Sequence, residues 1–260
     1  MNSVQREREW ENKKTEIARS SFSVSLLSSR TEILDSFFRG AASLERERSA
    51  ENVRVYPVGG RIKRLLDVTI AFSTLILLFP LFLLTALLIK LIDGGPVIFA
   101  HSRIGYNARP FLCLKFRTMV RNSEETLRWH LAQSNEAAHE WATTRKLKRD
   151  PRVTALGSLL RSVSFDEFPQ LINVLRGEMS IVGPRPIVAK EVEMYGNDAA
   201  HYFRARPGLT GPWQISGRSD VSYQTRVMLD RNYVENWSLW RDLLIIFRTF
   251  HVVALAKGSY

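Results

Sequence analysis

Cysteine is nearly absent from this chain of 260 residues, in which Cys113 is the only one. A lone cysteine cannot form a disulfide within the monomer, and it cannot supply the thiolates of a zinc site. The five histidines are not paired at the spacing of metal ligands either. The sequence therefore excludes a disulfide framework and a zinc module, and it is consistent with a chain that faces the reducing cytosol.

Glycine-rich nucleotide loops are missing as well. The sequence has neither a Walker-type loop ending in Lys-Ser or Lys-Thr nor a dinucleotide-type glycine triad that follows a strand. Any metal bound by this chain would then be a hard cation held by carboxylate and phosphate oxygens, for which magnesium is the natural choice.

Acidic residues are in deficit. The chain has 26 Asp and Glu against 37 Lys and Arg, which gives a net charge of +11. Such an excess predicts an anionic partner: a nucleic acid, an anionic membrane surface or a phosphate-rich substrate. Hydrophobic residues make up 45% of the chain, which excludes disorder of the whole. Composition alone does not choose among the three partners.

The first 57 residues are polar. Mixed-charge runs at Gln5–Glu9 and Leu44–Arg48 flank the serine-rich stretch Ser20–Ser29. No apolar core of a secretory signal occurs among them. We therefore expect residues 1–57 to form a disordered or loosely helical N-terminal extension.

The long apolar run lies between Val68 and Ile89, where no charged residue occurs. It is long enough for a helix that crosses a bilayer, which needs about 20 residues. Pro80 near its middle predicts a kink, because proline removes a backbone hydrogen bond and clashes with the preceding turn. Both flanks are basic, and basic flanks favour the cytoplasmic side. We therefore expect residues 58–95 to form a re-entrant hairpin broken at Pro80, with a single spanning helix as the alternative. The basic flanking residues are Arg61, Lys63, Arg64 and Lys90.

After Gly95 the pattern changes to short β-like runs. The runs Val97–Ala100 and Phe111–Phe116, joined by a turn-rich segment, predict a β-hairpin. The basic residues Arg103, Lys115 and Arg117 would project from it.

Two helical stretches follow. Residues 122–149 predict a charged helix. Near the C-terminus, large apolar residues at helical spacing predict a helix that lies either in the core or in a membrane interface, where tryptophan is favoured. These residues are Trp237, Trp240, Leu244, Phe247 and Phe250.

Two adjacent acids, Asp166 and Glu167, stand at a predicted helix start. Ser164 would be the N-cap, with Glu167 three positions later completing a capping box, and Pro169 is tolerated in the first turn. The spacing also places Glu167 in a row with Leu171, at the border of buried surface. Adjacent carboxylates, one of them part-buried, are more than a cap requires, so both are candidates for chemistry.

Arginines held by turn-forming residues are candidate phosphate ligands. Pro184 and Pro186 fix the backbone around Arg185, whose planar guanidinium suits bidentate binding of phosphate. Arg218 ends a turn-rich run and is a second candidate clamp. Asp230 is a candidate metal ligand or arginine partner. A rigid loop with a solvated arginine would produce the same local pattern.

Five short motifs follow one another along the chain: Lys63-Arg-x-x-Asp67, Lys115-Phe-Arg-Thr-Met119, Ser164-x-Asp-Glu167, Gly183-Pro-Arg-Pro186 and Arg206-Pro-Gly-Leu-Thr-Gly211. In this order they resemble the bacterial sugar transferase family, the monotopic phosphoglycosyl transferases. The resemblance covers about residues 58–260 and is closest to the undecaprenyl-phosphate galactose phosphotransferases that initiate exopolysaccharides. One departure is Phe79-Pro80 at the membrane break, where many members have Ser-Pro.

This resemblance implies transfer of a sugar 1-phosphate from a UDP-sugar to undecaprenyl phosphate with release of UMP. It implies that Asp166 is the nucleophile of a phosphosugar-aspartyl intermediate, and that Glu167 is its acidic partner and a magnesium ligand. The remaining expected roles are phosphate binding by Arg161, Arg185 and Arg218, substrate binding by Arg103, Lys115 and Arg117, and metal binding by Asp230.

The expected fold is a helix-dominated α+β structure. A Pro-broken re-entrant membrane hairpin at 58–95 would precede a cytosolic catalytic domain at 96–260, which would have a small β-hairpin and interfacial amphipathic helices. The enzyme would lie on the cytoplasmic face of the bacterial inner membrane, bound to anionic phospholipids. Nucleic acid is not expected as a partner, and homo-oligomerisation is left open.

Two alternatives remain at this point. The chain could instead be a membrane-tethered basic binding protein or a silent scaffold for polysaccharide assembly, although it has no recognised nucleic-acid motif. The sugar could be glucose or an N-acetylhexosamine instead of galactose.

Overall fold

A computed structural model of the chain describes residues 56–216 and 222–255. The compact unit that contains them begins at Tyr56. The candidate Arg218 lies outside the described residues. So does the expected N-terminal extension, except for its last two residues.

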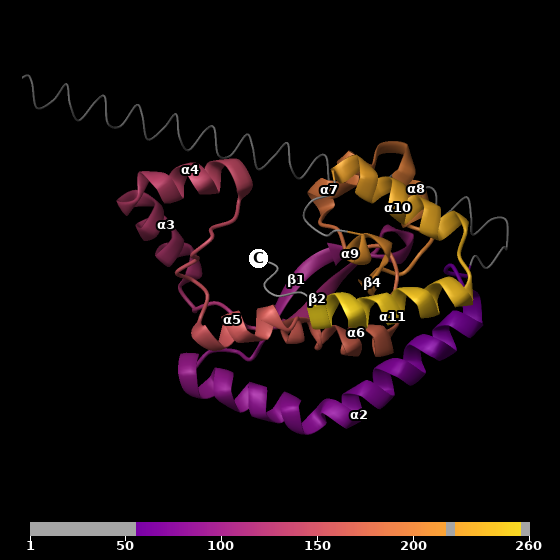
Figure 1. Cartoon of the computed structure of the whole chain (residues 1–260), viewed down its shortest axis with the longest axis horizontal. Helices are drawn as coiled ribbons and strands as arrows, with labels where there is room; N and C mark the ends of the chain where they lie inside the picture. The colour runs from indigo at the N-terminus through magenta and orange to yellow at the C-terminus, as the bar shows by residue number, and fades with distance from the viewer. Residues whose placement is uncertain (1–55, 217–221, 256–260) are drawn as a thin grey trace, which may run out of the picture. The chain divides into compact units, whose positions relative to one another are not determined.

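The apolar segment forms one continuous helix, α2 (Gly60–Asp93), with Pro80 inside it. Figure 1 shows that α2 bends about midway along its length, as expected for a helix that contains a proline. Its most apolar window of 18 residues has a mean hydropathy of 2.7, and only 11% of that window is buried. By length and composition, α2 could cross a membrane.

The N-terminal end of α2 is fixed by buried charged groups. Lys63 Nζ lies 2.7 Å from Asp242 Oδ2 in α11 (Leu239–Leu255). Asp67 accepts hydrogen bonds from the Ser180 hydroxyl and the Ile181 N–H in β3 (Ser180–Val182). Burial of a charge is costly unless it is paired and hydrogen-bonded in this way, so these contacts fix the N-terminal end of α2 on the rest of the unit.

The C-terminal end of α2 packs on the same unit. Ile89 shares a buried cluster with Phe116, Leu160 and Phe165. Asp93 Oδ2 lies 3.6 Å from the Arg117 guanidinium. Both ends of the bent helix therefore contact one body.

The predicted β-hairpin is confirmed. Strands β1 (Ile98–Ile104) and β2 (Pro110–Phe116) are antiparallel, with Phe99 opposite Lys115 and Arg103 opposite Phe111. The carboxamide of Asn173 fastens the outer edge of β2, because it accepts from the Leu114 N–H and donates to the Leu112 carbonyl. This side chain takes the place of a third strand.

The predicted helix over 122–149 is wrong as a single element. The chain forms α3 (Ser123–Gln133) and α4 (Asn135–Thr144), because Ser134 leaves the helical conformation and its hydroxyl caps α4 at Ala137 N–H. The next elements are α5 (Ala155–Ser162), a 3-10 turn η2 (Phe165–Glu167) and α6 (Gln170–Arg176).

The remaining elements enclose a second small sheet, in which β3 pairs in parallel with β4 (Gly208–Thr210). The core of this part contains Leu171, Met179, Val182 and Tyr233. The helices around it are α7 (Ala189–Tyr195), α8 (Ala199–Tyr202), α9 (Pro212–Ile215) and α10 (Tyr223–Glu235). The fold is thus helix-dominated α+β, as expected.

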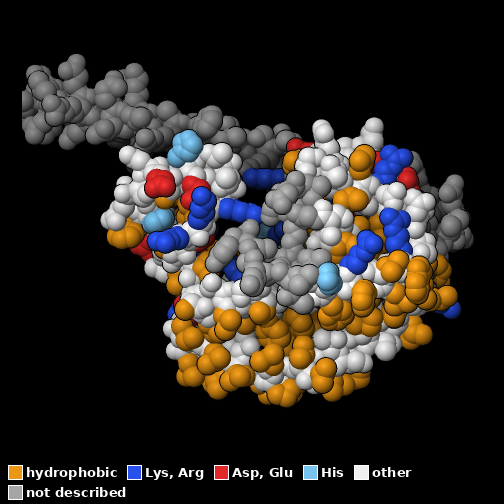
Figure 2. Space-filling view, viewed as in Figure 1, with side chains coloured by type: hydrophobic (Ala, Val, Ile, Leu, Met, Phe, Trp, Pro, Cys, Tyr) orange, Lys and Arg blue, Asp and Glu red, His pale blue; other side chains and the backbone are white. Residues whose placement is uncertain are grey.

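Apolar side chains gather on one side of the described unit. Figure 2 shows them along the edge where α2 runs. On α11, Trp240, Phe247 and Phe250 are also exposed, at about 70% each. Exposed apolar surface on this scale marks an interaction site and is not typical of a soluble monomer.

Candidate active site

Asp166 and Glu167 lie in the 3-10 turn η2, and the predicted capping box is wrong. Ser164 adopts a left-handed conformation with φ of 55° and its side chain caps nothing, while α6 begins only at Gln170. In place of the predicted helix start, the chain makes a tight turn that places the buried Phe165 in the core. The acids therefore stand between two helices, where Asp166 is only 8% exposed.

Basic side chains surround this acidic pair. Lys115 Nζ lies 2.5 Å from Glu167 Oε1. Burial raises the pKa of Asp166, and the Glu167 charge acts in the same direction, while Lys115 and Arg161 oppose the rise. The structure thus brings Asp166, Glu167, Lys115 and Arg161 together. Their roles in phosphate chemistry stay predictions.

Arg161 is positioned through Thr118. Its Nε donates to Thr118 Oγ1 at 2.9 Å. Helix α5 approaches Thr118 so closely that a Cβ on Gly157 would lie 2.1 Å from the Thr118 carbonyl oxygen. Only glycine allows this approach, which sets the position of Arg161 relative to the acids.

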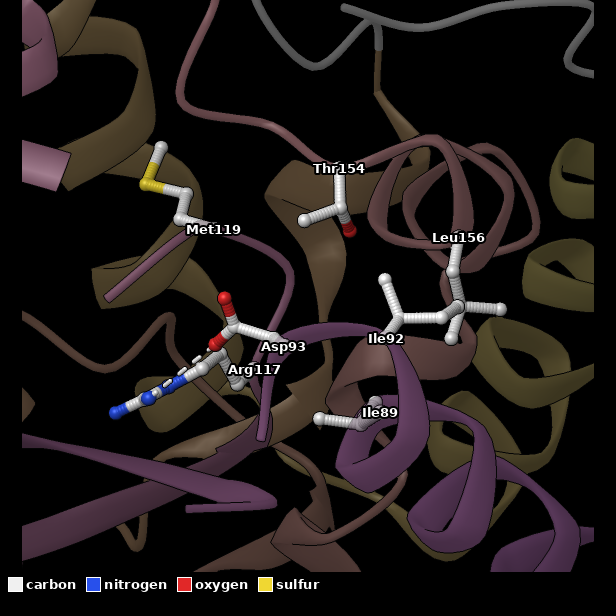
Figure 3. Close-up of a pocket in the computed structure, with 7 residues that line it drawn as sticks. All are labelled: Ile89, Ile92, Asp93, Arg117, Met119, Thr154 and Leu156. Atoms are coloured by element: carbon white, nitrogen blue, oxygen red, sulfur yellow. Dashed lines mark ion pairs between the residues drawn. The ribbon is translucent and has the colours of Figure 1, made fainter. Parts of the chain in front are cut away.

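Arg117, a predicted substrate-binding residue, is paired with Asp93 and not with the acidic pair. It lines a pocket between the end of α2 and the start of α5, drawn in Figure 3, where its guanidinium pairs with Asp93. The other walls of the pocket are apolar or uncharged and comprise Ile89, Ile92, Met119, Thr154 and Leu156.

A second polar cluster lies around Trp213. The guanidinium carbons of Arg185 and Arg226 lie 4.9 Å and 4.0 Å from the centroid of the Trp213 ring. The Asp230 carboxylate is 1% exposed and accepts a hydrogen bond of 2.7 Å from the Tyr195 hydroxyl. Burial raises the pKa of Asp230 to about 7, although that hydrogen bond and the two guanidiniums act against the rise.

Strands β1 and β2 connect the two clusters. Residues opposite each other in an antiparallel pair share a face, so Lys115, Cys113 and Arg103 lie on one face of the hairpin. Arg103 donates to the Pro186 carbonyl next to Arg185. The Cys113 thiol is within electrostatic range of Lys115, Arg103, Glu167 and Arg185. The two clusters are therefore neighbours, and Figure 2 shows Lys and Arg side chains facing a hollow beside α3 and α4.

The predicted site residues thus divide into groups. Arg103, Arg185 and Asp230 belong to the second cluster, which also contains Trp213, Arg226 and Tyr195; sequence reasoning missed these three. Arg226 could have been found, because it precedes Asp230 by four positions on one helix and so shares its face.

Glu167 and Asp230, the two acids predicted to bind metal, are not brought together by any contact of the described residues. The charges that act on Asp166 are those of Lys115, Glu167 and Arg161, whereas Arg226 and Arg185 act on Asp230. Among residues 56–216 and 222–255, no three His, Cys, Asp or Glu side chains are grouped so that they could hold a metal ion. Of the two acids, Glu167 is the one beside the proposed nucleophile.

The chain is similar to known proteins over most of its length. The profile of the family described as "Bacterial sugar transferase" matches residues 58–256. The exopolysaccharide production protein ExoY of Sinorhizobium fredii is 55% identical over 210 residues, which is 81% of this chain and 93% of that protein.

Longer relatives match over part of their length. The undecaprenyl-phosphate galactose phosphotransferase of Salmonella typhimurium is 48% identical over 199 residues, and the match covers 76% of this chain but 42% of that protein. A UDP-glucose:undecaprenyl-phosphate glucose-1-phosphate transferase of Caulobacter vibrioides is 39% identical over 206 residues, covering 76% of this chain and 72% of that protein.

Proposed function

Because this chain belongs to the bacterial sugar transferase family, we propose that it transfers galactose 1-phosphate from UDP-galactose to undecaprenyl phosphate and releases UMP. This reaction is the first membrane step of exopolysaccharide biosynthesis. The observation that carries the proposal is the buried Asp166 beside Glu167, with Lys115 and Arg161 acting on it. Transfer of glucose 1-phosphate is the second candidate, because one relative is named for it.

The reaction proceeds in two displacements. A carboxylate oxygen of Asp166 attacks the sugar-linked phosphorus, the bond from that phosphorus to the bridging oxygen breaks, and UMP leaves with the electron pair. A phosphate oxygen of undecaprenyl phosphate then attacks the phosphosugar-aspartyl intermediate, and the aspartate carboxylate is regenerated. A carboxylate nucleophile divides one difficult displacement between anions into two easier ones.

Basic residues offset the charge of these phosphates. Lys115 and Arg161 lie where negative charge accumulates on the transferred group, and phosphoryl transfer depends mainly on such positioning and electrostatic stabilisation. The hydrogen bond from Arg161 to the Thr118 hydroxyl keeps the guanidinium in place before substrate binds.

Glu167 is suited to hold magnesium. Its side chain is 36% exposed, and only Oε1 has a partner among the described residues, the Lys115 ammonium. Its other oxygen is a hard donor beside the nucleophile, and Mg²⁺ is commonly bound by one or two carboxylates plus substrate phosphates. The ion would neutralise charge on the diphosphate. Binding of metal by Asp230 stays a prediction. The Tyr195 hydroxyl and the two guanidiniums around this carboxylate are groups that bind anions.

The enzyme is proposed to enter the membrane from one side. Support comes from the bend in α2, from the contacts of both its ends with one body and from the exposed aromatic residues of α11. A helix that crossed the bilayer could not keep both ends on a body at one surface. Anionic phospholipids of the cytoplasmic leaflet would attract the basic flanks.

The topology can be tested with a membrane-impermeant maleimide. Single cysteines at Arg61, in the first turn of α2, and at Pro96, just beyond its end, should both be protected in intact spheroplasts and both react in inverted vesicles. Trp129→Cys on exposed α3 is the matched cytoplasmic control, and the buried Cys113 gives a low background. Reaction of the two flanking sites from opposite faces would refute the one-sided insertion.

The activity is tested by UMP release across a panel of UDP-sugars, with undecaprenyl phosphate and magnesium present. We expect UDP-galactose to be the preferred donor. Incubation with radiolabelled UDP-galactose but without lipid should label the protein, and Asp166→Asn should abolish both labelling and turnover. Labelling that persists in this variant would eliminate Asp166 as nucleophile, and absence of UMP release from every donor would refute the proposed reaction.

A further inference from the structure

Arg185 and Arg226 differ from the other part-buried arginines of the described unit. Arg103 and Arg206, for example, each donate to a backbone carbonyl. Among the described residues, the guanidiniums of Arg185 and Arg226 have neither a hydrogen bond nor an ion pair, and the Arg226 Nε is buried without a partner. Their contact is with the ring of Trp213.

Unpartnered polar atoms gather around the same ring. Seven buried side-chain atoms of the described residues lack a hydrogen-bond partner, and four of them lie on α9 and α10. Buried polar groups in native proteins nearly always have a partner, so this concentration indicates a ligand-binding region. The four atoms are Trp213 Nε1, Gln214 Oε1, Arg226 Nε and Asp230 Oδ1.

Stacking on an aromatic ring leaves a guanidinium ready to bind. The ring attracts the cation without using its N–H groups, which lie in the guanidinium plane and can still engage an oxyanion in bidentate fashion. Arg226 is held over two rings, since its guanidinium carbon also lies 5.2 Å from the Tyr223 centroid. Both guanidiniums act on the buried Asp230 carboxylate. Two cations thus face one buried acid, and the cluster can accept a further anion.

We propose that Arg226 is a second phosphate-binding residue of the donor site, and that Arg226 and Arg185 together hold the diphosphate of the UDP-sugar. The inference rests on the proposed function and adds a residue to it. A pair of guanidiniums on one ring matches a donor with two adjacent phosphates better than a lipid acceptor with one. Arg103, which donates to the Pro186 carbonyl next to Arg185, shares a face of the hairpin with Lys115, the partner of Glu167. An anion bound at Arg185 is therefore on the side of the hairpin from which Lys115 contacts the acidic pair.

The test compares Arg226→Gln with Arg231→Gln on the full-length protein in nanodiscs. Arg231 is on the same helix but is half exposed and paired with Asp198 and Glu235, so its replacement should change nothing. Titration with UDP should show affinity about tenfold or more weaker for Arg226→Gln, the loss typical of a charge-assisted hydrogen bond. The KM for UDP-galactose should rise similarly, while the KM for undecaprenyl phosphate stays unchanged.

Other outcomes overturn the inference. UDP affinity equal to that of wild type, or a rise in the KM for the lipid phosphate in place of the donor, would contradict it. Equal losses in both KM values together with a lower melting temperature would show a structural role. Should Arg226→Gln not fold, Arg226→Lys keeps the stem over Trp213 and the charge but loses the planar fork, and its UDP affinity should be intermediate. Because UDP binding needs no turnover, a wild-type protein that binds UDP but releases no UMP would refute the proposed function alone.

Discussion

Asp242 holds the start of the membrane helix, and its removal should lower stability strongly. The carboxylate is fully buried and accepts hydrogen bonds from Lys63 Nζ at 2.7 Å, Tyr233 Oη at 2.7 Å and Trp237 Nε1 at 3.0 Å. In Asp242→Ala the Lys63 ammonium and the Trp237 N–H lose this acceptor, while the Tyr233 hydroxyl keeps only the Val182 carbonyl at 3.2 Å. The Lys63 ammonium then stays buried with Asp67 at 3.9 Å as its remaining ion-pair partner. Breaking a buried ion pair costs about 3–5 kcal/mol.

Because the Asp67 charge remains near Lys63, we expect the free energy of unfolding to fall by about 3 kcal/mol, the lower end of that range. For a unit of this size, that loss corresponds to a drop in melting temperature of about 6–12 °C. Thermal unfolding in detergent, followed by circular dichroism, measures it. Asp198→Ala is the matched control, because its partner Arg231 is solvent-exposed and the pair should contribute nothing measurable.

A second variant separates charge from packing. Lys63→Met combined with Asp242→Leu removes both charges, so the double variant should recover most of the stability lost in Asp242→Ala. A melting temperature of Asp242→Ala within 2 °C of wild type, judged on the scale of about 2–4 °C per kcal/mol, would refute the reasoning that this ion pair anchors α2.

Three further predictions concern the acidic pair. Lys115→Met should lower kcat for UMP release about a hundredfold, because the charge beside the transferred phosphate is lost. The melting temperature should change little, since the Lys115–Glu167 pair is a third exposed. An unchanged kcat would contradict the role of Lys115. Gly157→Ala should lower kcat and stability together, because its Cβ would overlap the carbonyl oxygen of Thr118, the residue whose hydroxyl positions Arg161, whereas Ser158→Ala on the exposed side of α5 should have no effect. Removal of magnesium with EDTA should abolish UMP release and added Mg²⁺ should restore it; full activity in EDTA would refute the metal requirement.

Local chemistry made several features predictable. The uncharged run from Val68 to Ile89 and its internal Pro80 predicted a long apolar helix with a kink, since hydropathy and the missing proline N–H act within a few residues. The re-entrant hairpin stays a prediction. Alternating residues around a turn predicted the β-hairpin. The acids Asp166 and Glu167 were found because two adjacent carboxylates exceed what a helix cap needs.

Other features were decided by contacts between distant segments. The capping box at Ser164 failed because packing of Phe165 against Phe116 and Ile89 outweighed the local helix signal. Spacing did not reveal that Asp67 and Lys63 are buried partners of β3 and α11.

By itself, the sequence determined the family, through five short motifs in a fixed order, and it located the long apolar helix and the two adjacent acids, because motifs, hydropathy and adjacency are properties of neighbouring residues. Only the tertiary structure decided which cations serve the acids. Lys115 reaches Glu167 across 52 positions of sequence, and Arg226 meets Arg185 at Trp213. Such pairings depend on how helices and strands pack, since a charged side chain stays buried only where the fold supplies its partner.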